Sequence, residues 1–454
     1  MRCVFLLGIY SIVTAGCLVG PAAAQQTLSL RDAVTTAQSN DPWLQGSQLQ
    51  QKAKENRSIA AGELPDPSVS FTMMNLPLDS LKLDQENMTQ AQFGISQAFP
   101  RGDSRSISQQ KLAIESAMGP FERENRRAMI DRDVTLLWLD AWLAMRSKTL
   151  IEDNSVLFEQ IRDIAQTTYA SAAGKSRQQD IIRAELELIR FEDRATVQAQ
   201  NLEVALSALS EWLQPYQSDS LTLSSSETTS DTLPATLPNI DPALSISALI
   251  GTGSDQTLIE HLTRHPTIQA IELQYQASQK DVELAKEQYK PQWKLNASYG
   301  WRDDMPSGQS RADLFSVGVT LDVPLFTENR QDRTVRASVY EAQAVKTQKL
   351  VVLKSLLAKV REQTRHLVRL NQRESLYSDQ ILTQAQAQAQ ASMTAYMNDN
   401  GDFSEVVRAR ITELEARLSA LSVQVDKLKR TAQLNYYLTQ TSAASDPAKG
   451  TINE

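Results

Sequence analysis

The sequence predicts a mainly α-helical fold that also carries membrane β-strands and is built twice within one chain. Four marker residues each recur at one constant spacing, and the pairs are Pro42 and Pro266, Pro67 and Pro291, Gly94 and Gly318, and Pro100 and Pro324. Long stretches rich in Gln, Ala, Leu, Glu and Arg are typical of extended helices. Four stretches of about 10 residues alternate between apolar and polar residues, as the strands of a membrane barrel do. The spacing is too long for a solenoid repeat, so we expect two equivalent halves in a pseudo-symmetric molecule.

The N-terminus predicts a secretory signal peptide over residues 1–24. Arg2 is the only charged residue of this segment, residues 4–19 form its apolar region, and a run of alanines follows. Small residues at this point are typical of a signal-peptidase site, so we expect cleavage between Ala24 and Gln25.

Lipidation at Cys17 is an alternative fate of the same segment. Thr14 stands where such a site normally carries an aliphatic residue, which favours ordinary cleavage. Cleavage after Ala24 removes both cysteines, so the mature chain contains no thiol and no disulfide. With a formal net charge of −8, the chain is also a poor candidate for binding nucleic acid.

The alternating stretches predict two β-hairpins, at 67–100 and 291–324. Their apolar positions are Val69, Phe71 and Met73; Phe93, Ile95 and Phe99; Trp293, Leu295, Ala297, Tyr299 and Trp301; and Phe315, Val317, Val319, Leu321 and Val323. The alternative is a pair of amphipathic hairpins that pack on a soluble core. If the strands cross a membrane, four of them cannot close a barrel, and an open sheet edge cannot face lipid. The membrane interpretation therefore requires several copies whose strands together form one closed barrel.

Helices are predicted over 25–66, 101–214, 256–290 and 325–438. Arg330 to Ala395 contains neither Gly nor Pro, which predicts one helix about 100 Å long at 1.5 Å per residue.

The matching run in the first half extends from Asp103 to Thr168 and should kink at Gly119–Pro120. Four shorter helices should stack in pairs beside the long ones, at Leu30–Ala60, Gln178–Leu213, Leu258–Lys290 and Glu405–Leu438.

Two of the short helices carry coiled-coil seams with alternating steps of three and four positions. The seams are Ile181, Ala184, Leu188, Phe191, Ala195, Gln198, Leu202, Ala205, Leu209 and Trp212, and then Val407, Ile411, Leu414, Leu418, Leu421, Val425 and Leu428. Such regular seams predict helices that pack along their whole length. Residues 215–255 and 439–454 are polar or proline-containing and predict irregular structure.

These features resemble the TolC-like outer-membrane efflux factors over nearly the whole mature chain. The resemblance is carried by the duplicated layout, by Tyr169-x4-Gly174 and Tyr396-x4-Gly401 at the helical turns, and by the acidic-aliphatic-aliphatic-x-Ala segments 180–184 and 405–409. Segments 64–77 and 88–100 look like the subset that exports heavy metals.

The resemblance implies a homotrimer with a twelve-stranded barrel in the Gram-negative outer membrane and a helical cylinder that extends into the periplasm. It implies passive conduction rather than catalysis, with outer-membrane lipid, a periplasmic membrane-fusion adaptor and an inner-membrane resistance-nodulation-division pump as partners. Metal cations are the cargo implied by the subset. A multidrug or type I secretion conduit of the same family, or a periplasmic coiled-coil adaptor or scaffold, are the alternatives.

The resemblance also implies where the adaptor docks, at the two helical turns farthest from the membrane. The residues of these turns are Tyr169, Gly174 and Asp180 in the first half, and Tyr396 and Gly401 in the second. Glycine permits a tight reversal or the close approach of a partner backbone. The alternative is ordinary helix termination, which any helical hairpin requires.

Family members close their periplasmic aperture with acidic residues just after the second turn. Glu405 matches the first such position, whereas Arg408 replaces the second. A Glu405–Arg408 pair between subunits could hold the tip closed, and an ordinary pair within one helix is the alternative. Asp399 and Asp402 add negative charge that could favour cations at the same turn.

No residue pattern predicts catalysis, a cofactor or a resident metal. His261 and His265 have the i,i+4 spacing of metal ligands, but no third ligand is evident nearby. Gly174-Lys175-Ser176 resembles the end of a phosphate-binding loop, but Tyr169 stands where its first glycine is needed.

Overall fold

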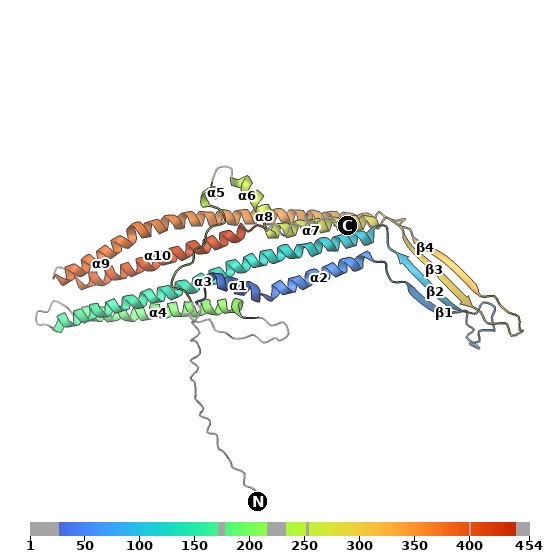
Figure 1. Ribbon diagram of the computed structural model, residues 1–454, viewed down its shortest axis with the longest axis horizontal. Helices are drawn as coiled ribbons and strands as arrows, with labels where there is room; N and C mark the ends of the chain where they lie inside the picture. The colour runs from blue at the N-terminus through green and yellow to red at the C-terminus, as the bar shows by residue number, and fades with distance from the viewer. Residues whose placement is uncertain (1–26, 171–177, 216–232, 251–253, 399–400, 442–454) are drawn as a thin grey trace, which may run out of the picture.

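The computed structural model describes residues 27–170, 178–215, 233–250, 254–398 and 401–441. The molecule is elongated, with helices along its length and a β-sheet at one end (Figure 1). The predicted signal peptide with Cys17, Ala24 and Gln25 lies outside the described residues, and so do Gly174 and Asp399.

The two halves have the same order of elements. The first half comprises α1 (Leu30–Asn40), α2 (Pro42–Gly62), β1 (Ser68–Met74), β2 (Gln90–Phe99), α3 (Ser104–Ala170) and α4 (Gln178–Leu213). After a short helix α5 (Ile246–Ile250), the second half comprises α6 (Ser254–Thr263), α7 (Pro266–Glu287), β3 (Gln292–Trp301), β4 (Leu314–Asp322), α8 (Gln331–Leu376), the π-helical segment η2 (Tyr377–Ile381), α9 (Leu382–Met397) and α10 (Phe403–Tyr437). The duplication read from the sequence is therefore a duplication of structure.

Two helices that the sequence analysis treated as continuous are each broken at the same point of the repeat. Leu30–Ala60 divides into α1 and α2 because Asp41 caps α2 by accepting from Trp43 N–H, and Pro42 occupies its first position. Leu258–Lys290 divides in the same way, with His265 as the cap and Pro266 following it. Proline is favoured at the first position of a helix and disrupts an interior one, so each cap starts a new helix.

The two long helices differ from each other in their continuity, and one of them differs from the prediction. The predicted single helix Arg330–Ala395 is interrupted by η2, where the helix widens for one turn between α8 and α9. In the first half, α3 is one helix of 67 residues that continues through Pro120. Within the part of the chain that the structure describes, no helix is both long and apolar enough to cross a membrane.

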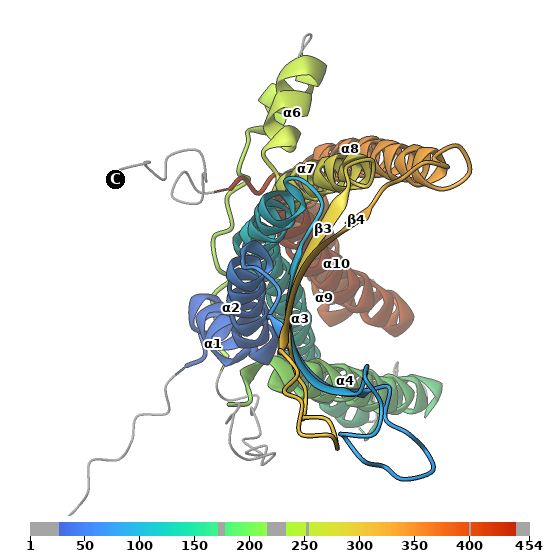
Figure 2. The same ribbon diagram turned by 90° about the vertical axis from the view of Figure 1, so that its right-hand side faces the viewer.

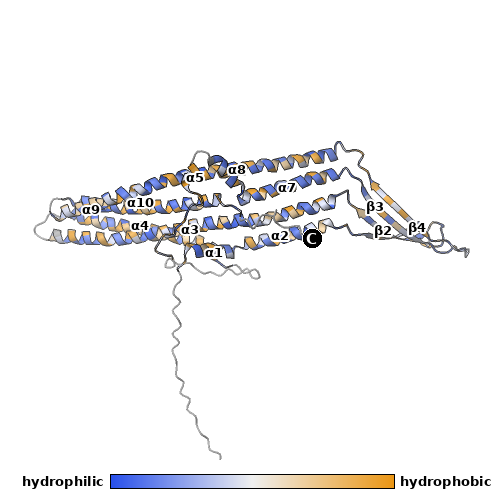
Figure 3. Ribbon diagram, turned by 45° about the horizontal axis from the view of Figure 1, so that its top comes forward, coloured by the Kyte–Doolittle hydropathy of each residue, from blue (hydrophilic) through white to orange (hydrophobic). Residues whose placement is uncertain are grey.

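Three clusters of buried side chains lie along the helices rather than in one central core. The cluster between α1, α3 and α4 includes Trp138, whose indole N–H donates to Leu28 O at 3.1 Å. A second cluster, nearer the helical tips, joins Phe158 of α3 to Phe191 of α4 and Leu414 of α10. The third joins α6, α7 and α8 to the end of α10. Apolar residues accordingly recur along narrow stripes of the helices (Figure 3).

The four strands form one antiparallel sheet in the order β1–β2–β3–β4. The middle pair joins the two halves, since Phe93 of β2 lies opposite Tyr299 of β3. Both edge strands, β1 and β4, are unpaired on their outer sides among the described residues. Seen from the sheet end, the elements follow an open arc, with α8 near one end of the arc and α4 near the other (Figure 2).

Candidate functional site

One face of the sheet is a continuous apolar surface. The strand register aligns Phe71, Phe93, Tyr299 and Phe315 in one row across all four strands. The neighbouring row contains Val69, Ile95, Ala297 and Val317. Apart from Ala297, these side chains are large and exposed in the single chain, Phe315 at 71% and Val69 at 79%. So large an exposed apolar patch marks contact with a protein or a membrane rather than with water.

The opposite face of the sheet is polar. The row behind the phenylalanines contains Ser70, Gly94, Ser298 and Ser316. Gln92 Nε2 on this face donates to Ser298 Oγ at 2.7 Å. The sheet therefore separates an apolar side from a polar side.

The loops at the outer end of the sheet are joined by Arg311, a residue that the sequence analysis missed. Arg311 is only 8% exposed. Its guanidinium lies in the β3–β4 loop and donates to two carbonyl oxygens of the β1–β2 loop, Glu86 O at 2.7 Å and Leu83 O at 3.2 Å. A third bond, to Asp303 O, holds it within its own loop. The two hairpin loops thus form one unit, although no local pattern around an isolated arginine could have predicted the partner loop.

The α3–α4 and α9–α10 ends lie together at the other extreme of the molecule, farthest from the sheet (Figure 1). Tyr169 is exposed near the end of α3. Asp180 is buried in the first turn of α4, where a carboxylate is stabilised by the helix dipole. Of these two predicted tip residues, Tyr169 is therefore accessible to a partner in the single chain, whereas Asp180 is not.

Gly401 packs directly against the end of α9. A Cβ at this position would lie 2.7 Å from Tyr396 N and 2.9 Å from Ala395 C, closer than atoms can approach. Beside it, the Tyr396 ring contacts Phe403 edge-on, with the ring centroids 5.7 Å apart. The Tyr396 hydroxyl is buried and has no hydrogen-bond partner among the described residues. Gly401 therefore does permit the close approach of a second backbone segment, but that segment is the end of α9 in the same chain.

The predicted aperture residues form local interactions on α10. Arg408 Nη1 lies 2.5 Å from Glu405 Oε1, and both side chains are largely exposed. Asp402 caps the helix by accepting from Ser404 N–H at 3.2 Å. Within one chain, Glu405 and Arg408 therefore make the intrahelical i,i+3 pair, and Asp402 caps the N-terminus of α10.

His261 and His265 are occupied by the packing between α6, α7 and the end of α10. His265 Nδ1 accepts from Thr267 N–H at 3.2 Å, so Nε2 carries the proton and donates to Tyr436 O at 3.2 Å. His261 bonds to Leu438 O and to the Gln440 side chain. Burial lowers the pKa of His265 to about 4, which keeps the ring neutral at physiological pH. No group of three or more possible metal ligands occurs among the described side chains.

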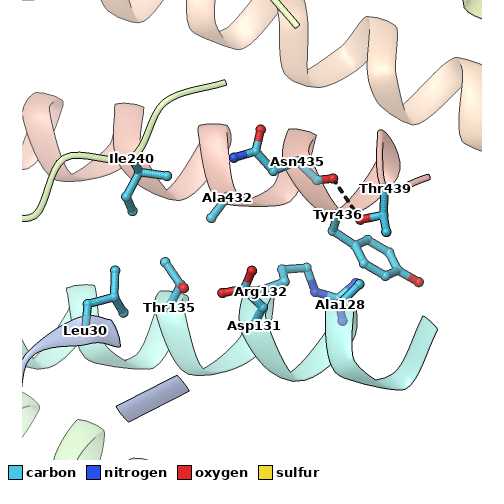
Figure 4. A pocket seen from close by; sticks show the side chains of 10 residues that line it. All are labelled: Leu30, Ala128, Asp131, Arg132, Thr135, Ile240, Ala432, Asn435, Tyr436 and Thr439. Atoms are coloured by element: carbon cyan, nitrogen blue, oxygen red, sulfur yellow. Dashed lines mark hydrogen bonds between the residues drawn. The ribbon is translucent and has the colours of Figure 1, made fainter. Parts of the chain in front are cut away.

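A small cavity of about 160 Å³ lies between α3 and α10 (Figure 4). Arg132 lies over the Tyr436 ring, 4.3 Å from its centroid, and Asp131 lines the cavity beside it. Burial raises the pKa of the Asp131 carboxyl. The contact between Arg132 of α3 and Tyr436 of α10 at this cavity joins the two halves of the chain.

Residues 258–439, which comprise most of the second half, match the family described as Outer membrane efflux protein. No curated protein sequence matches the chain.

Several solved structures share the fold. The outer-membrane channel OprN has a TM-score of 0.72 and 17% sequence identity, covering 90% of this chain and 89% of its own. VceC, an outer membrane protein of Vibrio cholerae, has a TM-score of 0.70 and 14% identity, covering 90% and 96%. CusC, described for its folding and transmembrane channel formation, has a TM-score of 0.69 and 15% identity, covering 94% and 96%. The chain thus has the fold of outer-membrane channels along nearly its whole length.

Proposed function

We propose that this protein is the outer-membrane channel subunit of a tripartite efflux system and conducts exported solutes passively. Three copies would pool their strands into a twelve-stranded barrel, and their helices would form a cylinder that crosses the periplasm. The family match covers the second half. Because the first half repeats the same order of elements, the match supports this assignment for the chain as a whole.

The apolar face of the sheet is the single observation that carries the proposal. A sheet with one apolar and one polar face, whose two edges are unpaired among the described residues, suits a membrane only when neighbouring copies complete it. The exposed aromatic residues would face lipid, and the serine- and glycine-containing face would line an aqueous pore.

The helical tips would dock a membrane-fusion adaptor, which connects the channel to an inner-membrane resistance-nodulation-division pump. Their position farthest from the sheet supports this role. Tyr169 offers an exposed aromatic side chain for a partner helix. Glu405 and Arg408 lie at the same end of the molecule, on the surface of α10, where they could exchange their intrahelical pair for one between subunits and so control the aperture.

Metal cations are the cargo that we propose, and the segments 64–77 and 88–100 support this choice by their resemblance to the heavy-metal subset. A conduit does not need to hold its cargo, so the protein need not bind the cation tightly. Growth of a deletion strain on a panel of metals, dyes and detergents tests the cargo. Sensitivity confined to metals supports the proposal, whereas sensitivity confined to dyes and detergents would indicate a multidrug conduit.

Cell fractionation tests the channel assignment itself. We expect a detergent-resistant trimer in the outer-membrane fraction that converts to monomer on boiling, as barrel-containing assemblies do when their sheets unfold. A monomer in the soluble periplasmic extract would instead support an adaptor or scaffold.

A further inference from the structure

Four arginines form a stripe along α8, a feature that the sequence analysis missed. Arg361, Arg365, Arg369 and Arg373 follow one another at i,i+4 spacing. Residues at this spacing are neighbours on the helix surface, and like charges there destabilise the helix. Residues 354–373 contain six lysines and arginines but one acidic residue, although the chain as a whole is acidic. The helix therefore carries a local repulsion that a partner of opposite charge would relieve.

Little of this positive charge is neutralised within the chain. Arg361 pairs with Asp255, with Nη2 and Oδ2 at 2.8 Å. The one acidic residue of the segment, Glu362, is itself paired with Lys359 at 3.0 Å. The other three arginines of the stripe have no ion-pair partner in the part of the chain that the structure describes. They are exposed and free to bind an external carboxylate.

Three arginines of the stripe line a groove of about 640 Å³ between α8 and the short helix α5. The groove combines charged and apolar residues, namely Arg361, Arg365 and Arg369 with Leu249, Ile250 and Val368. Leu249 also packs against the third cluster of buried side chains, so this wall of the groove belongs to the folded core. Such a volume is typical of pockets for small ligands and is too small for a folded domain. The lining suits a short ligand that carries carboxylates beside small apolar groups.

The groove lies on the outer side of the row of helices. α5 and α6 stand out beside α8 (Figure 1), and α6 projects away from the arc of elements (Figure 2). The helical rise of 1.5 Å per residue places Arg365 about 50 Å along α8 from its first residue, Gln331. In the proposed channel this position is on the outer surface of the cylinder, within the periplasm, where the cell wall lies. The inference below rests on the proposed function, because the sheet must lie in the outer membrane to place the groove there.

We propose that the groove binds the carboxylate-bearing stem peptides of peptidoglycan and so attaches the channel to the cell wall. These peptides are short, carry several free carboxylates and contain alanine. The guanidinium group of arginine binds carboxylates through charge-assisted, often bidentate hydrogen bonds. The alanine methyl groups match the apolar wall formed by Leu249 and Ile250.

The lengths of the groove and of the ligand also agree. Arg361 and Arg369 are about 12 Å apart along the axis of α8. A fully extended peptide of four residues spans about 13 Å. One stem peptide that lies along the groove can therefore place more than one carboxylate beside the stripe.

Co-sedimentation with purified sacculi, the insoluble peptidoglycan of the cell wall, tests the inference on the full-length trimer in detergent. The groove variant Arg365→Gln with Arg369→Gln removes two charges, and glutamine keeps a side chain that favours the helix. We expect its affinity for sacculi to fall about tenfold, because two charge-assisted contacts are lost.

The matched control removes the same charge from the same helix outside the groove. Arg333 and Arg336 are exposed residues of α8 nearer the sheet, and neither lines the groove. The variant Arg333→Gln with Arg336→Gln should sediment with sacculi as the wild type does. A general effect of net charge would weaken both variants equally.

Competition identifies the part of the peptidoglycan that is bound. Soluble stem peptide added in excess should release the wild-type trimer from sacculi. Soluble glycan strands, from which an amidase has removed the peptides, should not release it.

The outcomes separate the inference from the proposed function. Weaker sedimentation of the groove variant alone, together with release by stem peptide, supports the inference. No sedimentation of the wild-type trimer, equal sedimentation of the wild type and the groove variant, equal weakening of both variants, or release by glycan instead of peptide overturns it and leaves the channel assignment standing. A groove variant that no longer forms trimers would show that the stripe contacts an adjacent copy, which also overturns it. Absence of any trimer from the outer-membrane extract overturns both.

Discussion

At the residue scale, equivalent positions of the two halves perform the same structural task with different chemistry. Asp41 and His265 directly precede the equivalent prolines Pro42 and Pro266, and each caps the helix that its proline begins. Asp41 is also paired with Arg126, with Nε and Oδ2 at 2.8 Å. His265 instead bonds to a backbone carbonyl and is held neutral by burial, so protonation of its Nδ1 would remove the lone pair that caps the helix.

This difference predicts a pH-dependent stability. The pKa of His265 is about 4 in the folded protein and 6.5 in the unfolded chain. The contribution of neutral His265 to the free energy of unfolding is therefore fully present above pH 6.5 and is lost as the pH falls toward 4. Protonation of His265 alone should lower the free energy of unfolding of the wild-type protein by about 2 kcal/mol between pH 7.5 and pH 5.

The variant His265→Asn isolates that effect, because asparagine caps the helix but does not titrate. Thermal melting in detergent at the two pH values should show a smaller difference for the variant than for the wild type. An equal difference would mean that other groups cause the pH dependence.

Gly401 is expected to tolerate no side chain. Gly401→Ala places a Cβ against the backbone of Ala395 and Tyr396, so the turn must rearrange and adaptor-dependent efflux should fall. Gly46→Ala is the matched control, because its Cβ meets nothing within 4 Å and alanine is favoured inside a helix. Thermal melting and complementation of a deletion strain measure both effects; equal behaviour of the two variants would contradict the role of the turn.

The exposed Glu405–Arg408 pair should contribute little to the stability of the fold. An i,i+3 pair on a helix surface is worth about 0.2–0.5 kcal/mol, so Glu405→Ala and Arg408→Ala should melt within about 1 °C of the wild type. If the pair controls the aperture, both variants should nevertheless increase the uptake of a large antibiotic through the outer membrane. Unchanged uptake together with unchanged melting would leave the pair as an ordinary surface interaction.

At the scale of elements, the sequence predicted the strands and helices because each depends on a local period. It predicted the duplication because marker residues recur at one long, constant spacing. The helix breaks at Pro42 and Pro266 were also visible, as a capping residue followed by proline, but the predicted helix lengths ignored them. The π-helical segment Tyr377–Ile381 has no such signal, since its sequence contains neither Gly nor Pro. The contacts of Arg311 join two hairpin loops that no short-range pattern relates. Those of Gly401 lie within Tyr396-x4-Gly401, so the sequence indicated the turn but not which backbone atoms meet.

A second apolar stripe of α4, made of the exposed residues Ile182, Leu186 and Ile189, shows why the assignment of helix faces needed the structure. Its residues share the helical period of the core seam, so the sequence cannot say which stripe faces a partner in the same chain. The structure separates them, because Phe191 is buried and Ile189 is 63% exposed.

If this exposed stripe faces an adjacent copy in the proposed trimer, a charge placed on it should weaken the trimer and leave the subunit folded. Ile189→Asp leaves the core of the single chain untouched, so the expected result is a folded protein whose trimer dissociates at a lower temperature on a gel. Leu414→Asp at the equivalent position of α10 should destabilise the subunit itself, because this side chain is fully buried. Glu203→Lys, a charge change outside the stripe, is the control; an equal loss of trimer in that variant would contradict the assignment.

At the scale of the whole molecule, the arrangement places an amphipathic sheet at one end and two helical hairpin tips at the other (Figure 1). Neither edge of the sheet is paired within the described residues, and the arc of elements is open (Figure 2). This open arrangement is what the proposed ring of several copies requires, because each unpaired edge would then meet the edge of a neighbouring copy.

The central claim is that a complete ring of copies conducts passively, and electrical recording tests it most directly. Trimer purified from the outer membrane and added to a planar lipid bilayer should produce discrete current steps without any nucleotide or pump. Verified trimer that leaves the bilayer electrically silent across a range of voltages would contradict the account.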